Sequence, residues 1–243
     1  MRAPAAALIV ALLLGSSGAA AQVAPATLVD RAIVRFEASE LGGAAHPRFI
    51  FERTLAFEAR LEALAEAQRG IPLPQSSPYE DRHVRAALER HVTEEILANL
   101  PVVPPLTELD VRARSIPTQL MLQQQVGGRA ALLDAAVAEG MESEDLDLLV
   151  RRRARASLYL DRMVAPMLEP SDAELREVHR TEATPFRNRP FDEIEPQLRQ
   201  WYVADRLAAS LAAFFRGARA RIHIVVLPGS REPESAALAP DTR

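Results

Sequence analysis

Two histidines, His83 and His91, carry the most versatile side chains of this sequence, because imidazole can both bind metals and transfer protons. Glu80, Glu94 and Glu95 lie close to them in the chain. A metal-binding pair on a helix needs a spacing of three or four residues. These two histidines are eight residues apart, which separates them by about 12 Å along a helix axis. We therefore expect ordinary histidines and no metal site.

Charged side chains form two further clusters with possible chemistry. The acids Glu142, Glu144, Asp145 and Asp147 lack the loop spacing and the glycine of a calcium motif, so we interpret them as acids at a helix start. The run Arg151–Arg155 contains four arginines that could contact anionic lipid or the carboxylates of a substrate. Acids one turn earlier can pair with them, which favours a solvated, salt-bridged face. The sequence leaves the role of this run open.

No catalytic signature is present. The chain contains no cysteine, and we find no Ser-His-Asp arrangement, phosphate-binding loop or nucleophile elbow. The sequence therefore predicts neither an enzyme nor a cofactor. The formal net charge of −4 argues against nucleic acid as the main partner, since phosphate binding needs a basic face.

Apolar and aromatic side chains gather in the last predicted helix. They form either a core, which we favour for Trp201 and Ile194, or the lining of a peptide-binding groove. The candidate groove residues are Phe191, Ile194, Trp201, Tyr202, Phe214 and Phe215.

The two ends of the chain have compositions of their own. Residues 1–21 have a positive start, an apolar core of about ten residues and an A-x-A site, which predicts a signal peptide cleaved near Ala21. No later segment is apolar enough to cross a bilayer, so we expect no stable membrane insertion. The mature product is expected in the periplasm or outside the cell. Residues 228–243 are polar and proline-rich and predict a disordered tail.

Helical patterns fill most of the chain between these ends. Stripes of apolar residues predict helices over 51–67, 107–126 and 129–139, the last one stopped by Gly140. Ser77 and Ser143 are expected to cap two further helices, and Ser171 with Glu174 forms a capping box for another. Pro117 is expected to break or kink its helix near Ser115.

One isolated strand, Arg221–Leu227, follows the last helix. Because a strand cannot leave its backbone groups unpaired in a packed interior, it needs a partner. The convincing partner segment lies around Leu28–Phe36, near the other end of the mature chain. We therefore predict a mostly α fold of about six helices, with a small antiparallel sheet that joins the N-terminal and C-terminal strands.

Taken in order, these elements resemble the periplasmic SurA-type chaperones, in the peptide-binding part that they share with trigger-factor-like proteins. Gly127–Leu146 is similar to the family's helix–turn–helix, and Pro170–Leu175 to the helix start that follows it. Pro190–Ile194 and the strand Arg221–Leu227 resemble the family's C-terminal helix and closing strand. The segment from His46 to Pro105 departs from the pattern. The resemblance implies a single SurA-like peptide-binding domain over residues 22–227.

One part of the family pattern is missing. SurA-like proteins usually carry a parvulin isomerase domain of roughly ninety residues before the last helix. Here only nine residues, Thr181–Arg189, separate the two flanking helices. The resemblance therefore implies the chaperone module without its prolyl isomerase.

The function that we expect is an ATP-independent periplasmic chaperone or peptide-binding protein. Its partners would be unfolded or extended polypeptides, such as secreted or outer-membrane proteins. One alternative is a structural interaction protein that binds one dedicated partner or itself. Another is a degenerate prolyl isomerase with residual activity. The sequence identifies neither the client nor the oligomeric state.

Overall fold

The computed structural model describes residues 30–73, 77–181, 184–219 and 221–228, with the side chains of 214–219 left undescribed. The predicted signal peptide, residues 1–21, and all but the first residue of the predicted tail, residues 228–243, lie outside these ranges. In the described part, seven α-helices and a three-stranded antiparallel sheet confirm the mostly α fold with a small sheet.

The sheet joins the two ends of the chain, as predicted. Its strands are β1 (Ala32–Glu37), β2 (Arg48–Phe51) and β3 (His223–Val226), in the order β2-β1-β3. In β1, Val34 lies opposite Val226 of β3 and Ile50 of β2. The strand β2 was not predicted. Four residues between Pro47 and a helix are too short to show an alternating pattern.

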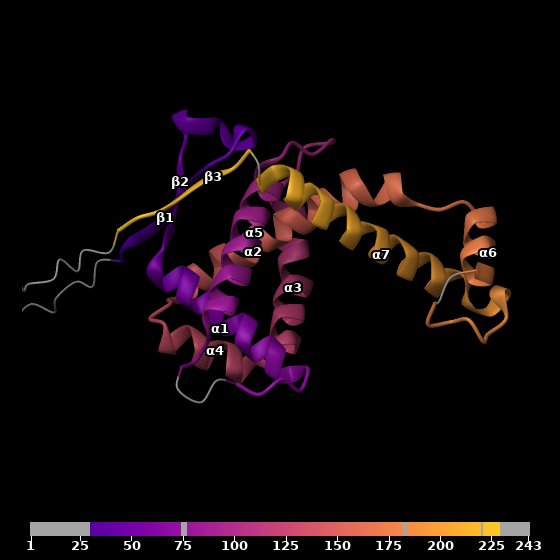
Figure 1. Cartoon of the computed structure of the whole chain (residues 1–243), viewed down its shortest axis with the longest axis horizontal. Coiled ribbons are helices and arrows are strands. Elements are labelled where there is room, and N and C mark those ends of the chain that lie inside the picture. The colour runs from indigo at the N-terminus through magenta and orange to yellow at the C-terminus, as the bar shows by residue number, and fades with distance from the viewer. Residues whose placement is uncertain (1–29, 74–76, 182–183, 220, 229–243) are drawn as a thin grey trace, which may run out of the picture.

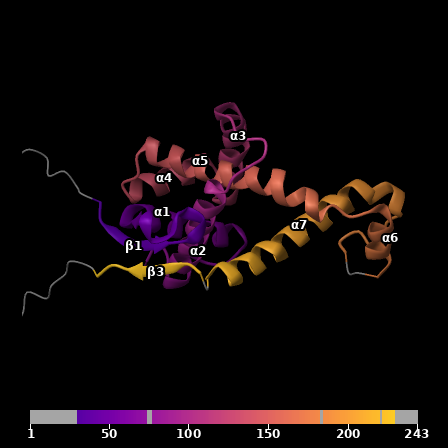
Figure 2. The ribbon, with the colours of Figure 1, turned by 90° about the horizontal axis from the view of Figure 1, so that it is seen from above.

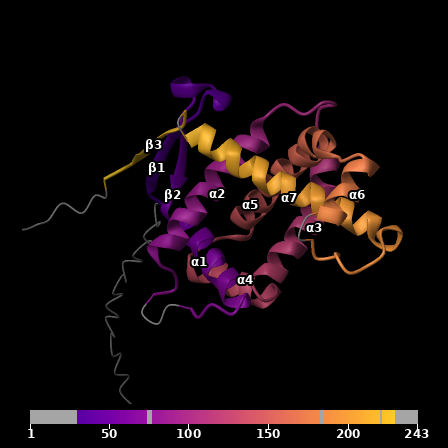
Figure 3. The same cartoon turned by 45° about the vertical axis from the view of Figure 1, so that its right-hand side comes forward.

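The helices form a body and an arm (Figure 1). Helices α1 to α5 make the body beside the sheet, and α7 crosses it and extends to α6 at the far end. Figure 2 shows α7 and β3 on one side of the body and α3 on the other, and Figure 3 shows α7 passing in front of α5. The helices are α1 (Glu52–Gln68), α2 (Asp81–Asn99), α3 (Glu108–Gln125), α4 (Arg129–Ala138), α5 (Ser143–Tyr159), α6 (Asp172–Thr181) and α7 (Phe191–Arg219).

Shorter turns connect these elements. A π-helical segment, Leu160–Val164, and a 3-10 turn, Ala165–Leu168, continue α5 toward the arm. Two more 3-10 turns, Ser39–Leu41 and Gly43–Ala45, join β1 to β2.

Two predicted helix ends are confirmed. Gly140 has a φ of +65° directly after the α4 cap, a left-handed conformation that glycine adopts without steric cost. At the start of α6, Ser171 and Glu174 bond to each other reciprocally: the Ser171 N–H donates to the carboxylate, and the Glu174 N–H donates to the Ser171 hydroxyl.

Two predicted helix caps are wrong, and the predicted break at Pro117 is absent. Carboxylates, not serine hydroxyls, cap α2 and α5. Glu80 and Glu142 are the cap residues, each in a capping box, and Ser77 instead donates a hydrogen bond to the carbonyl of Tyr79. Helix α3 continues through Pro117 without a break. Glu108 and Asp110 form ion pairs with Arg151 and Arg162 before the proline, and Leu122 packs in the core with α4 and α5 after it.

Two large apolar cores fill the body and a third lies in the arm, while a small cluster of Leu97, Ala98 and Ala156 joins α2 to α5 beside Leu211 of α7. Residues of the sheet, α1 and α2 form the first, around Phe36, Ile50 and Ile96. The second, around Phe57 and Leu132, joins α1, α3, α4 and α5. The third packs α6 against α7.

Candidate polypeptide-binding site

The predicted groove residues of α7 lie in the core of the arm. Ile194 is fully buried and Tyr202 is 7% exposed, next to Leu198. Phe191 and Trp201 are half-buried and pack against the same cluster. Their first role is therefore to hold α6 on α7. The side chains of the other two candidates, Phe214 and Phe215, lie outside the described part of the structure.

Two arginines stack on rings at the surface of this arm core. The guanidinium of Arg176 lies 5.3 Å from the ring centre of Phe191, and that of Arg206 lies 4.9 Å from the ring centre of Tyr202. At these distances the cations are attracted to the ring faces. They cover part of the aromatic surface that would otherwise face solvent.

The arginine run of α5 forms ion pairs with other helices, which corrects the prediction of a solvated face paired within α5. Arg152 donates to Glu58 of α1 at 2.7 Å and to Glu94 of α2 at 3.2 Å. Arg153 also pairs with Glu94, at 3.1 Å, and Arg151 donates two hydrogen bonds to Glu108 of α3. These partners are 43 or more residues away in sequence, so no local pattern indicates them.

The two histidines of α2 are also held by α1. His91 Nδ1 lies 2.8 Å from Glu58 Oε1, and both side chains are buried. His83 accepts a hydrogen bond from the Glu80 N–H through Nδ1, and its Nε2 lies 3.0 Å from Glu66. They are thus hydrogen-bonded to carboxylates, and in the described residues no group of three or more His, Cys, Asp or Glu could hold a metal.

Glu58 is the centre of this charged network, and it is 1% exposed. Burial by itself raises the pKa of its carboxyl group. The attraction of Arg152, the hydrogen bond to His91 and the more distant Arg153 outweigh burial and lower that pKa to about 2. Glu58 is therefore ionised at neutral pH, and its charge holds α1, α2 and α5 together.

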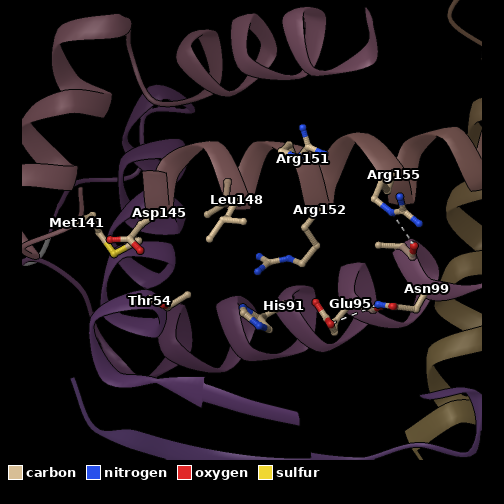
Figure 4. A pocket seen from close by; sticks show the side chains of 12 residues that line it. Thr54, His91, Glu95, Asn99, Met141, Asp145, Leu148, Arg151, Arg152 and Arg155 are labelled. Carbon is tan, nitrogen blue, oxygen red and sulfur yellow. Dashed lines mark hydrogen bonds between the residues drawn. The ribbon is translucent and has the colours of Figure 1, made fainter. Parts of the chain in front are cut away.

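A pocket of about 370 Å³, lined by both charged and apolar residues, lies beside the network, between α2 and α5 (Figure 4). Arg152 and Arg155 extend into it from α5, and His91, Glu95 and Asn99 from α2. Arg155 donates to the carbonyl of Ala98, and Asn99 donates to Glu95. Charged side chains around the pocket are also bonded to partners outside its lining: Arg151 to Glu108, Arg152 to Glu58 and Glu94, and Glu95 to Arg48. These bonds join helices of the body to each other and to β2.

An apolar groove of about 650 Å³ lies on the side of α2 that faces α7 and β3. Leu88 and Val92 of α2, Ala212 of α7, and Ile222 and Ile224 around the start of β3 line it. Arg85, Glu89 and Arg90 form its charged rim on α2. This groove was not predicted, although the apolar spacing of Ile222, Ile224 and Val226 indicates one continuous strand face.

The core-facing side of β3 becomes uncovered along the strand. Ile224 and Val226 lie opposite Phe36 and Val34, so their side chains are on the same side of the sheet as the core. Ile222 still packs against the core, whereas Ile224 is 39% exposed and Val226 is 71% exposed. The start of the strand is therefore covered and lines the groove through Ile222 and Ile224, whereas Val226 at its end is exposed outside the groove lining.

Helix α3 has a second uncovered apolar surface. Val111, Leu122 and Val126 point into the core, while Leu109, Ile116 and Leu120 are 76%, 65% and 54% exposed. At 100° per residue, these exposed side chains lie opposite the buried ones. A helix of a monomeric protein normally carries polar residues there, so the outer face of α3 is also a candidate contact surface.

Comparison with family models, with curated proteins and with solved structures gives no match for this chain. None of the described helices is long and apolar enough to span a membrane. The structure is mostly helical, and a three-stranded sheet joins the two ends of the chain. Apolar surface is exposed on α2, β3 and α3.

Proposed function

We propose that this protein is an ATP-independent periplasmic chaperone or peptide-binding protein that holds unfolded secreted or outer-membrane polypeptides, without prolyl isomerase activity. The observation that carries the proposal is the apolar groove between α2, α7 and β3. Its floor is formed by Leu88, Val92 and Ile222, and its rim carries charges that keep the surface hydrated. Grooves of this kind bury apolar side chains of a client without strict sequence selection.

The resemblance to SurA-type chaperones and the predicted signal peptide support the same proposal and its location. The short connection between α6 and α7 supports the absence of isomerase activity, because α6 ends at Thr181 and α7 begins at Phe191. A catalytic domain of roughly ninety residues has no room in this connection.

An aggregation assay tests the proposal. An unfolded outer-membrane protein is diluted from urea into buffer with equimolar chaperone, and light scattering is followed. The wild type is expected to delay aggregation. Ala212→Arg, which places a long side chain in the groove from an exposed position of α7, is expected to abolish most of the delay.

The matched control is Ala213→Arg. It makes the same change on the next residue of the same helix, at an exposed position that does not line the groove. It should protect the client as the wild type does. If the wild type fails to delay aggregation of several unrelated clients, the proposal is wrong.

A dedicated interaction partner is the second candidate function, and the outer face of α3 favours it. Leu109, Ile116 and Leu120 follow the spacing with which one helix packs along another. A pull-down from periplasmic extract that yields one stoichiometric protein, lost in Ile116→Glu, with no binding of unfolded clients, would favour this candidate over the chaperone.

A further inference from the structure

The outer edge of β3 is unpaired in the described part of the chain. The sheet order places β3 at the edge, with β1 as its one neighbour. The Leu227 N–H donates to the Ile33 carbonyl at 2.8 Å, so the alternation of an antiparallel ladder assigns the backbone groups of Val225 and His223 to β1 as well. The N–H and C=O groups of Ile224 and Val226 therefore point away from the sheet.

This edge has one usual protection of an edge strand, its short length, and lacks the others within its four residues. Natural proteins keep edge strands very short or block them with charges, prolines or bulges. The sequence of β3 is His-Ile-Val-Val, with no charged residue and no proline, and the register with β1 is regular over all four residues. Strand β3 therefore carries β-branched side chains, and its free backbone N–H and C=O groups can pair with another strand.

The free edge and the apolar groove adjoin each other. Ile224 belongs to both, because its backbone groups face the free edge and its side chain lines the groove. A strand added beyond β3 continues the sheet over the groove. Alternate side chains of that strand then point toward Leu88, Val92 and Ala212, and the others point to solvent.

The charged residues at the rim of the groove indicate which charge an added strand would carry. Arg90 pairs with Glu62, at 2.9 Å. Arg85, by contrast, is exposed and makes no ion pair with any residue that the structure describes. An acidic group on the bound strand complements this free charge.

We propose that the edge of β3 binds an extended segment of another polypeptide by strand addition, with apolar side chains at alternate positions and an acidic residue within reach of Arg85. The inference rests on the proposed function and specifies how the client is held. A second copy of this chain fits the edge less well. Pairing two four-residue strands buries far less than the roughly 1,200 Å² of a stable dimer.

The first test compares two variants at Val226, whose side chain is mostly exposed. Val226→Pro removes the N–H at the free edge and takes no hydrogen bond from the β1 ladder. Val226→Thr keeps the N–H and the branched shape. Binding of a fluorescent eight-residue peptide, with valine alternating with threonine and glutamate at one end, is followed by anisotropy. Val226→Pro should bind about tenfold more weakly, and Val226→Thr within about twofold of wild type.

The second test leaves the protein unchanged. Peptides N-methylated at alternate residues lose the N–H groups of one edge only, so one of the two methylation patterns must block pairing with β3 while the other permits it. We expect the two patterns to differ in affinity by about tenfold or more. Replacing the terminal glutamate by glutamine should weaken binding to wild type and leave binding to Arg85→Gln unchanged.

The outcomes separate the inference from the proposed function. If Ala212→Arg abolishes peptide binding while Val226→Pro and both methylation patterns have no effect, strand addition is wrong and the groove still binds clients. If the wild type binds neither peptide nor unfolded protein, both fail. If sedimentation shows a dimer that Val226→Pro dissociates, the occupant is a second copy, which overturns the inference.

Discussion

Arg152→Met is the perturbation that most directly tests the buried charged network. Arg152 is 12% exposed and bonds to Glu58, which is 1% exposed, and to Glu94, which is 13% exposed. Methionine keeps most of the volume of the side chain and removes its charge. Glu58 then remains buried with His91 and the more distant Arg153 as its compensation. Removing one partner of a buried ion pair typically costs about 3–5 kcal/mol of unfolding free energy.

The pKa of Glu58 gives a second estimate of the same magnitude. Lowering it from 4.5 to about 2 corresponds to roughly 3 kcal/mol at neutral pH. Because the pKa is lower in the folded protein than in the unfolded chain, this contribution is complete above about pH 4.5 and is lost as the pH falls toward 2. Arg152→Met removes the strongest of the groups that lower the pKa of Glu58. Burial then raises this pKa above its value in the unfolded chain. The variant's deficit should therefore be largest near pH 7.5 and smaller at pH 5.

Urea denaturation followed by circular dichroism at pH 7.5 and pH 5 measures this effect. The matched control is Arg112→Met, which removes an exposed partner of Glu108 and should cost at most about 0.5 kcal/mol at either pH. The double variant Glu58→Gln with Arg152→Met leaves no unpaired charge and should recover at least half of the loss. A deficit for Arg152→Met no larger than that of Arg112→Met, or one that does not change with pH, would refute the reasoning.

Three local changes have effects that thermal denaturation can measure. Pro117→Ala should raise stability by about 1 kcal/mol or more, because α3 continues through this exposed position and gains a backbone donor; an unchanged midpoint would mean that the local backbone does not relax. Gly140→Ala should cost about 1 kcal/mol, since alanine is strained at a φ of +65°. Glu174→Ala should cost about 1 kcal/mol through loss of the α6 capping box, with faster amide exchange confined to the start of α6.

Local sequence patterns were sufficient at two helix ends, but not at the starts of α2 and α5, where Glu80 and Glu142 are the caps in place of the predicted serines. Gly140 ends α4 and the Ser171–Glu174 pair starts α6, because both effects act within one helical turn. The pairing of β1 with β3 is a long-range contact, yet it was predictable. An isolated strand must find a partner, and one convincing candidate segment was available.

The charged network and the groove escaped prediction because they depend on packing between distant segments. Nothing near Arg152 in the sequence points to Glu58, 94 residues away. Acids close to the arginine run offered a simpler local pairing that the fold does not use. Likewise, the groove exists because the end of α7 lies beside α2 while β3 extends past it. That arrangement decides which of Ile222, Ile224 and Val226 is covered.

Helix α2 connects the charged network to the proposed binding site. On one side, His91 and Glu94 fix α2 to α1 and α5 through Glu58 and Arg152. On the other side, Val92, the neighbour of His91, forms part of the floor of the groove. An apolar floor alone could shift or close when no client is bound, because nothing directional holds it. Hydrogen-bonded charges are directional, and they fix α2 relative to α1 and α5. A wall of the proposed site that is fixed in this way needs less reorganisation when a client binds, which favours affinity.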